Sequence, residues 1–333
     1  MGSTILEAWG IEAWGIEAWG TNSRSTLNKN DPNRIQNISE TSLKMKVLLT
    51  TDGSESAEHS LRWFSRLPIA HSRSYEIITV GSYQVYGMVP VKVHDEFVRL
   101  ESARALDSFQ RAAAILQEVS LEAVQVPCLG QPADEITKVA KESKADLIVV
   151  GAHGRSQLTR MLLGSTSETV ARHAPCSVLV VRGKHMSHSK EGQPPHLTIA
   201  SDCSEVDDQI AAQVNGLGLP KDTKLELVSV IEHPYLLEPA FEYDAQITQE
   251  TKSAMDRLAK QLESTSANIE KHVFEKVHVG SCILDFIEKH PTDIVVLGDK
   301  GRSAIGRFFL GSVSRFILHH APCSVLLIRK RLE

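Results

Sequence analysis

Small residues with one fixed spacing occur twice in the sequence and could hold a phosphate group. Each set reads G-x-x-G, nine further residues, then G-S: Gly151, Gly154, Gly164 and Ser165, and again Gly298, Gly301, Gly311 and Ser312. A glycine lets a ligand approach bare backbone amides, and the closing Gly-Ser pair precedes a helix-forming segment whose N-terminus favours anions. The pattern predicts a phosphate-binding loop, although glycines at strand ends are also ordinary turn formers.

Charged side chains accompany both sets of glycines. Two arginines lie in each loop: Arg155 and Arg160, and again Arg302 and Arg307. Arginine donors suit phosphate oxygens. The first apolar run of each repeat ends in an aspartate, Asp52 or Asp202. Each aspartate either caps the helix that follows or faces the glycine loop across a crevice, as at ligand sites in open α/β sheets.

The chain contains an internal duplication. Residues 146–182 align without a gap to residues 293–329, and 19 of the 37 pairs are identical, including the run HAPCSVL. Chance does not produce this agreement, so one fold is expected to occur twice.

Short β-rich runs alternate with longer helix-patterned segments in each repeat, which predicts right-handed βαβ crossovers and a parallel sheet covered on both faces. The expected strands are 46–51, 75–81, 123–128, 146–150 and 177–182, then 196–201, 224–231, 272–279, 293–297 and 324–328. Helices are expected from Ser54, a good N-cap, and over 95–118.

The sequence divides into four parts. Residues 1–44 hold LEAWG and IEAWG pentads followed by a polar, turn-rich stretch, and they are expected to be a disordered extension. Domain 1 is placed at 45–182 and domain 2 at 196–333. Between them, the polar segment 183–195 ends in two prolines and reads as a linker.

Composition excludes several classes of protein. The net charge of −5 argues against nucleic acid as the main partner. No apolar run is long enough to span a membrane, and the N-terminus lacks the pattern of a signal peptide, so a cytoplasmic protein is expected. The five cysteines are scattered without a C-x-x-C pair, and the pair His319-His320 has no partner at metal-site spacing. We therefore expect no disulfide framework and no metal site built by the protein.

With its duplicated glycine loops ahead of an A-P-C-x-V-L strand, the segment from Met45 to Arg329 resembles the universal stress protein family in its tandem, ATP-binding form. The resemblance implies two Rossmann-like sheets of the adenine nucleotide alpha hydrolase-like type, each with five parallel strands in the order 3-2-1-4-5 and flanked by helices. It also implies ATP in the crevice, usually with Mg²⁺. Since the family tends to dimerise through the last strand, an intrachain pseudo-dimer is expected, and a homodimer is possible.

The resemblance also assigns the ligand-binding residues. Adenosine would meet Asp52 and Val80 in the first repeat, and Asp202 and Val230 in the second. The phosphates would meet Gly151, Gly154, Arg155, Gly164, Ser165 and Thr166, and in the second repeat Gly298, Gly301, Arg302, Gly311, Ser312 and Val313.

The second repeat departs from the family pattern at two positions. Cys203 stands where the first repeat has Gly53, and Asp299 stands opposite Ala152. A carboxylate beside a triphosphate is repulsive unless a metal or Lys300 intervenes, so the second site is expected to bind more weakly or to depend more on a metal ion.

The favoured function is a nucleotide-dependent regulator of the stress response that is not an enzyme and acts on an unidentified protein partner. The loop 151–167 contains no Asp or Glu, and His153 is its only obvious proton-transfer candidate, so efficient phosphoryl transfer is not expected. One alternative is a slow ATPase or autophosphorylating enzyme using the same crevice. Another is a nucleotide-free scaffold or a redox-responsive binding protein.

Overall fold

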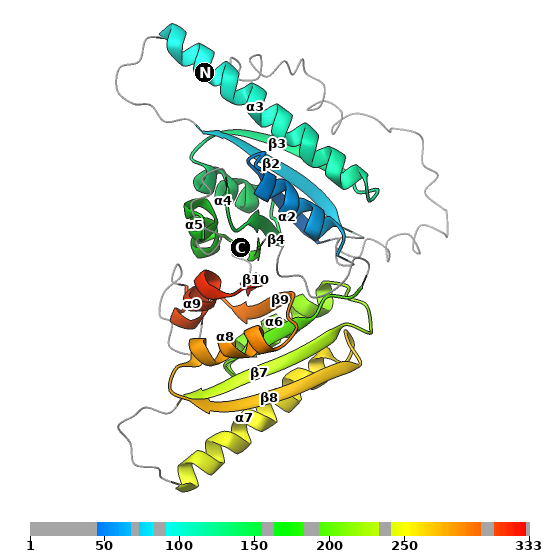
Figure 1. The fold of residues 1–333 in the computed structure, drawn as a ribbon, viewed down its shortest axis with the longest axis vertical. Helices are drawn as coiled ribbons and strands as arrows, with labels where there is room; N and C mark the ends of the chain where they lie inside the picture. Colours follow the sequence, from blue (N-terminus) through cyan, green and yellow to red (C-terminus); the bar gives the residue numbers. More distant parts are fainter. Residues whose placement is uncertain are drawn as a thin grey trace, which may run out of the picture.

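The computed structural model describes residues 45–67, 73–82, 91–154, 163–182, 193–232, 241–300 and 310–330 (Figure 1). The expected extension 1–44 and most of the expected linker lie outside these residues. The described strands form one ten-stranded sheet with the order β3-β2-β1-β4-β5-β10-β9-β6-β7-β8. The α/β fold class predicted from the sequence is confirmed, and the two five-stranded sheets are joined into one.

The central strands coincide with apolar runs of the sequence, because a strand covered on both faces buries every side chain, whereas the two edge strands keep exposed side chains. Their bounds are β1 Lys46–Thr51, β2 Ser74–Ser82, β3 Ala123–Gly130, β4 Leu147–Gly151, β5 Ser177–Val181, β6 Leu197–Ser201, β7 Lys224–Glu232, β8 Asn268–Lys276, β9 Ile294–Gly298 and β10 Ser324–Ile328. The five strands β4, β5, β6, β9 and β10 are buried along their whole length.

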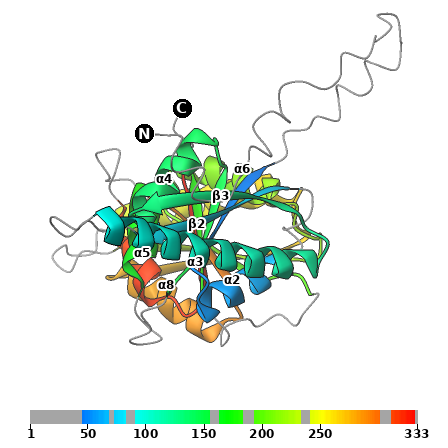
Figure 2. The ribbon, with the colours of Figure 1, turned by 90° about the horizontal axis from the view of Figure 1, so that it is seen from above.

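Helices cover both faces of the sheet. Their bounds are α2 Glu55–Ser65, α3 Val91–Gln117, α4 Pro132–Glu142, α5 Ser165–His173, α6 Val206–Gly216, α7 Phe241–Leu262, α8 Val279–Lys289 and α9 Ser312–His320. Apolar side chains of α2, α3, α6 and α7 form one core cluster, and those of α4, α5, α8 and α9 form another. Figure 2 shows the long helix α3 lying across β2, against which it packs. Each core cluster runs through both repeats.

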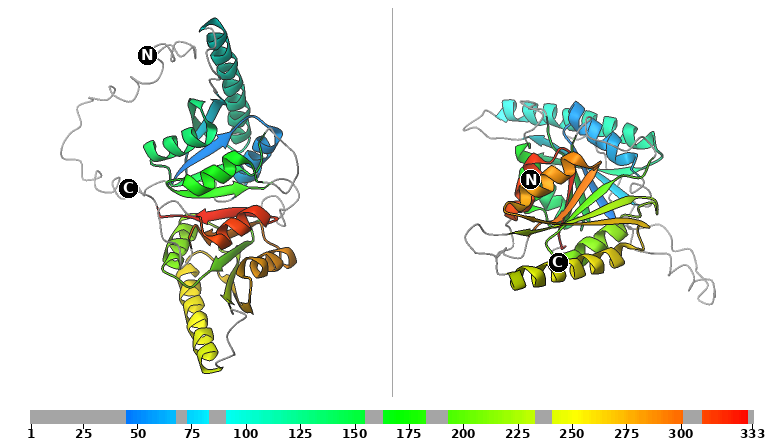
Figure 3. Two further views of the ribbon diagram at one scale, coloured as in Figure 1. Left: turned by 90° about the vertical axis from the view of Figure 1, so that its left-hand side faces the viewer. Right: turned by 60° about the horizontal axis from the view of Figure 1, so that its bottom comes forward.

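Strands β5 and β10 join the two repeats. They pair antiparallel, with Leu179 opposite Leu326, whereas every other strand pair in the described sheet is parallel. Figure 3 shows the two strands side by side in the middle of the molecule. The expected intrachain pairing of the last strands is therefore present, and it covers two apolar strand edges.

Two elements have a boundary that differs from the sequence prediction by more than two residues. Strand β8 begins at Asn268, four residues before the expected start, because its register with β7 places Asn268 beside Lys224. Its expected last residue, Val279, instead begins α8. Helix α3 begins at Val91 rather than at residue 95. None of the helices in the described part of the chain combines the length and hydrophobicity that a membrane span requires.

Candidate functional site

A cavity of about 300 Å³ opens at the carboxyl ends of β1, β2 and β4 in the first repeat. It lies beside the point where the strand order reverses: from β1 the chain continues to β2 on one side, and from β4, on the other side of β1, it continues to β5. Open α/β sheets bind ligands at such a point. The residues that line it are Thr50, Thr51, Asp52, Ala57, Ile78, Val80, Ser82, Pro132, Ile136, Val150, Gly151, His153, Gly154, Gly164, Ser165, Thr166 and Ser167. Its size suits a small molecule.

The structure brings together all of the predicted first-repeat residues that it describes. Asp52, Val80, Gly151, Gly154, Gly164, Ser165 and Thr166 all line this one cavity. They come from three strand ends and one helix start, spread over more than a hundred residues of sequence. Arg155 and Arg160 lie outside the described residues.

The N-terminus of α5 forms one wall of the cavity. Its N-cap residue is Gly164, which has no side chain to accept a hydrogen bond from the first turn of the helix. The Gly164 amide donates to the Ala152 carbonyl at 2.8 Å, and the Ser167 hydroxyl donates to the Gly151 carbonyl at 2.6 Å. These bonds hold the positive end of the helix dipole beside the glycine loop, an arrangement that favours an anion.

Asp52 is not the cap of the following helix. That position belongs to Ser54, whose hydroxyl accepts a hydrogen bond from the Ala57 amide at 3.2 Å. The Asp52 Oδ1 atom accepts from the Ser54 amide at 3.0 Å. Of the two roles that the sequence left open for Asp52, the structure supports the one that faces the crevice.

The loop glycine beside Asp52 is required for space rather than for a left-handed backbone. A Cβ atom on Gly154 would stand 2.7 Å from Asp52 Oδ2, and one on Gly151 would stand 3.1 Å from the Ser60 hydroxyl. Neither glycine has a positive φ. Backbone and carboxylate therefore approach each other closely, as a site that contacts a ligand with main-chain amides requires.

The second repeat reproduces this framework. The Gly311 amide donates to the Asp299 carbonyl at 2.8 Å, and the Ser314 hydroxyl donates to the Gly298 carbonyl at 2.8 Å. Asp202 Oδ1 accepts from the Ser204 amide at 3.2 Å. The remaining predicted residues that the structure describes take equivalent places: Val230 in β7, and Ser312 and Val313 in the first turn of α9. Gly301, Arg302 and Arg307 lie outside the described residues.

The surroundings of Asp299 do not support the repulsion expected of its carboxylate. Its side chain is largely buried, and its Oδ2 atom accepts a hydrogen bond from Arg329 Nε at 2.7 Å. A guanidinium at this distance compensates the carboxylate charge. The expected repulsion of a triphosphate by Asp299 is therefore offset by a residue from the end of β10.

Cys203 has the backbone conformation of the glycine it replaces. Its φ is +58°, close to the +72° of Gly53, and few residues with a side chain adopt such an angle. Its Sγ atom lies 3.5 Å from the Ser229 hydroxyl. The thiol therefore fills the space beside β7 in the second repeat.

Sequence reasoning missed several residues of the cavity. The apolar wall formed by Ile78 and Ile136 came from positions that read only as core, and Ser82 gave no signal. Ser167 could have been found, because the serine three residues after each loop-closing glycine is the same in both repeats, as Ser167 and Ser314.

A family model described as the universal stress protein family matches residues 45–182 and again residues 196–329. The chain belongs to the universal stress protein family. The universal stress protein YxiE of Bacillus subtilis is 33% identical over 148 residues, which cover 41% of this chain and 98% of that protein. A universal stress protein of Methanothermobacter thermautotrophicus is 34% identical over 145 residues, covering 41% of this chain and 94% of its own length. Each of these relatives corresponds to about one repeat.

Solved structures share the tandem architecture. The crystal structure of a universal stress protein from Archaeoglobus fulgidus superposes with a TM-score of 0.61 at 20% identity, covering 86% of this chain and 96% of that one. A putative universal stress protein from Pseudomonas aeruginosa gives a TM-score of 0.59 at 14% identity, covering 86% and 93%. At these identities the likeness shows that the fold is shared.

Proposed function

We propose that this universal stress protein binds ATP in the first-repeat cleft and uses the bound nucleotide to regulate a protein partner in the stress response. One observation carries the proposal: a carboxylate, an apolar wall and a helix N-terminus lie around a single cavity. These three features match the ribose hydroxyls, the base and the phosphates of a nucleotide. The cytoplasm is the compartment proposed for this activity, as the sequence analysis expects.

Each part of the cleft suits one part of the ligand. Ile78, Val80 and Ile136 offer an apolar surface to the adenine ring, and Asp52 offers an acceptor to ribose hydroxyl groups. The first turn of α5 and the amides around Gly154 would hold the phosphates. Mg²⁺ would bind chiefly through phosphate oxygens and water, since Asp52 is the only carboxylate among the described residues of the cavity.

Regulation is favoured over catalysis because of what lines the cleft. Phosphoryl transfer uses a metal-holding acid and a group that positions the attacking oxygen. Among the described residues of the cavity, His153 is the only side chain besides Asp52 that commonly transfers protons, and Lys300 replaces it in the second repeat. We propose that the nucleotide acts as a bound effector. A slow ATPase or an autophosphorylating enzyme is the alternative.

Identification of the nucleotide extracted from the purified full chain tests the proposal directly. We expect ATP to be recovered, and we expect added ATP to raise the thermal unfolding temperature. At about 100 times its dissociation constant, a ligand specific to the native state adds roughly 2.7 kcal/mol. Gly154→Val should reduce this gain because the larger side chain meets Asp52.

Gly216→Ala is the matched control, since a Cβ atom there meets only Met45 at 3.8 Å, far from the cleft in sequence and outside the residues that line it. If the chain carried no nucleotide and ATP gave no thermal shift, the nucleotide proposal would be abandoned in favour of a scaffold or a redox-responsive binder. Multiple-turnover release of phosphate that disappears in Asp52→Asn and Asp202→Asn variants would support the enzyme instead.

A further inference from the structure

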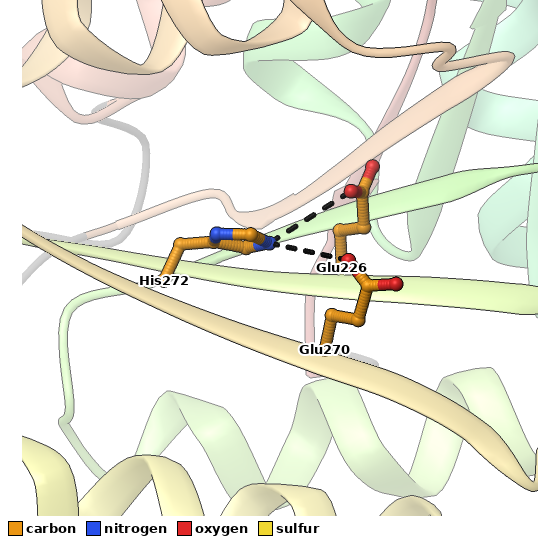
Figure 4. A group of neighbouring side chains, drawn as sticks. All are labelled: Glu226, Glu270 and His272. Carbon is orange, nitrogen blue, oxygen red and sulfur yellow. Dashed lines mark ion pairs between the residues drawn. The ribbon is translucent and has the colours of Figure 1, made fainter.

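A cluster of two glutamates and a histidine lies away from the proposed nucleotide cleft, near the amino ends of β7 and β8. Glu226 comes from β7, while Glu270 and His272 come from the neighbouring strand β8 (Figure 4). The nucleotide site of an open α/β sheet lies at the opposite, carboxyl end of the strands. This cluster therefore needs an explanation of its own.

The three side chains point their donor atoms at one another. His272 Nε2 lies 3.8 Å from Glu226 Oε1 and 3.8 Å from Glu270 Oε2, and one donor atom from each residue fits within 4.8 Å of the others. Donor atoms that share a tetrahedral zinc ion, with bonds of about 2.0–2.2 Å, stand roughly 3.4 Å apart. The observed separations approach that geometry without a change of backbone.

The cluster contains a buried carboxylate and a buried imidazole nitrogen without a hydrogen-bond partner. Glu226 is only 1% exposed, so its carboxylate is removed from water. His272 Nε2 is buried and has no hydrogen-bond partner, although it faces both carboxylates. A buried polar atom without a partner is costly, and a cation between the imidazole and the carboxylates would satisfy it.

The first repeat shows that the fold does not require this cluster. Glu76 occupies the position equivalent to Glu226, and it pairs with Lys46 at 2.7 Å. The sheet register places Val124 opposite Glu76, whereas it places Glu270 opposite Glu226. The position of His272 is taken by Val126 in the same alignment. Only the second repeat therefore gathers ligands around its buried glutamate.

Neighbouring aromatic rings hold the histidine in place. The His272 ring stacks against Phe274 at a centroid distance of 6.4 Å and contacts Phe286 at 4.8 Å. His290, at the end of α8, lies 3.2 Å from Glu226 Oε1 through its Nδ1 atom. Contacts of this kind orient the first ligands of a metal site and set their basicity.

Lys224 is the cation that the cluster holds in this structure. Its Nζ atom lies 3.2 Å from Glu226 Oε1 and 3.3 Å from Glu270 Oε1. The side chain is 26% exposed, and its flexible stem allows the ammonium to swing into water when another cation enters.

We propose that Glu226, Glu270 and His272 bind a divalent transition-metal ion, with Zn²⁺ as the best match, in exchange for Lys224. One imidazole and two carboxylates are a ligand set that zinc accepts, and water can supply the fourth position. The site is separate from the nucleotide cleft and does not depend on nucleotide binding.

Titration of the metal-free full chain with Zn²⁺ by calorimetry, and with Co²⁺ by visible absorption, tests the proposal. We expect one ion per chain at this site and at least tenfold weaker binding in Glu226→Gln and in His272→Gln. Lys224→Met should bind the ion more tightly, because it removes the competing ammonium. Glu76→Gln, which alters the equivalent glutamate of the first repeat, is the matched control and should leave the affinity unchanged.

Circular dichroism establishes whether each variant is folded, and the tighter binding of Lys224→Met provides a test that survives if Glu226→Gln unfolds. Two results would overturn the proposal. One is the absence of Zn²⁺ binding both in the natural sequence and in Lys224→Met. The other is equal affinity in folded His272→Gln and in the Glu76→Gln control, since the ion would then lie elsewhere on the chain.

Discussion

Two equivalent positions, Gly53 and Cys203, show how one backbone conformation accepts different residues. Both have a positive φ directly after the aspartate of their repeat. A Cβ atom on Gly53 would stand 2.3 Å from the Ser108 hydroxyl, so the first repeat has no room for a side chain in the present packing. Around Cys203, the hydroxyls of Ser201 and Ser229 lie within reach of the thiol. Local packing therefore decides which residue each repeat carries.

The buried cysteine that follows Ala-Pro in the second repeat gives a pH-dependent prediction. Burial raises the pKa of Cys323 from 9.0 to about 12. As the pH rises, the unfolded chain therefore loses this proton before the folded chain does. The contribution of the protonated thiol to the free energy of unfolding is fully present below pH 9 and is lost between pH 9 and about 12. One thiol contributes a slope of at most about 1.4 kcal/mol per pH unit.

Urea denaturation across this pH range, compared between the natural sequence and Cys323→Ala, isolates the thiol from the lysines and tyrosines that titrate nearby. The variant should show a shallower decline in its free energy of unfolding. Parallel curves would contradict the prediction. The same burial predicts slow alkylation of Cys323 in the folded protein at neutral pH, since the thiolate is the reactive form.

At the scale of single elements, α5 and α9 are fastened to the sheet by the same serine. Ser167 donates to the end of β4, and Ser314 donates to the end of β9. Both side chains are buried. The N-terminal end of each helix is thus held in place by a hydrogen bond to the strand that precedes it, which keeps the amides of the helix beside those of the glycine loop.

Ser167→Ala should loosen α5 and lower the free energy of unfolding by about 1–3 kcal/mol, because the Gly151 carbonyl loses its partner in a buried place. Hydrogen exchange followed by mass spectrometry should show faster exchange in α5 and unchanged exchange in α9. Ser314→Ala is the reciprocal control and should affect α9 alone. Equal protection of α5 in both variants would show that Ser167 does not fasten the helix.

The presence of each strand was easier to predict than its first and last residues. β1 and β10 agree with the expected ranges, because an apolar run between polar turns marks a buried strand. β8 differs because its polar residues Glu270, Lys271 and Glu275 hide the strand pattern, while Val279 reads equally well as strand or helix. An edge strand with one exposed face lacks the continuous apolar signal of the central strands.

At the scale of the whole molecule, arginines at the ends of the last strands connect the two repeats. Arg329 donates to the Ala171 carbonyl of α5 at 3.1 Å while it pairs with Asp299. Its equivalent, Arg182, donates to the Leu318 carbonyl of α9 at 2.5 Å. A cation at a helix C-terminus is stabilising, so each repeat caps a helix of the other.

The two caps differ in their charge balance. Among the residues that the structure describes, no acid pairs with Arg182, because Ala152 occupies the place of Asp299, and the Arg182 Nε atom is buried without a hydrogen-bond partner there. Burial lowers the pKa of Arg182. Through its ion pair with Asp299, Arg329 thus connects the second glycine loop to α5, which forms a wall of the first cleft. In the described part of the chain, Arg182 makes no corresponding ion pair between the first glycine loop and α9.

Arg329→Met should destabilise the chain by about 3–5 kcal/mol, because it leaves the Asp299 carboxylate buried without its partner. Adding Asp299→Asn to that variant should recover part of the loss, and thermal unfolding of the two single variants and the double variant measures the coupling. Arg172→Met is the control: it breaks an exposed pair with Glu168 and should cost at most about 1 kcal/mol. Additive losses from the two single variants would contradict the predicted coupling.

The sequence by itself determined the duplication, the fold class, most strands and the set of small residues in the first cleft. These features can be read from short segments or from the repeat. An apolar run indicates a strand, and the same spacing of small residues in both repeats indicates that both share a structural requirement. Asp52, Gly154 and Ser165 could therefore be assigned to one site before their positions in space were known.

Only the tertiary structure decided which distant residues neutralise or complete one another. Arg329 reaches Asp299 and α5 because β10 pairs with β5, and Glu226 meets His272 because of the register of β7 with β8. Such contacts depend on strand pairing and on how helices pack over the sheet. No periodicity along the chain encodes them, since residues that meet across a sheet or an interface share no fixed spacing in sequence.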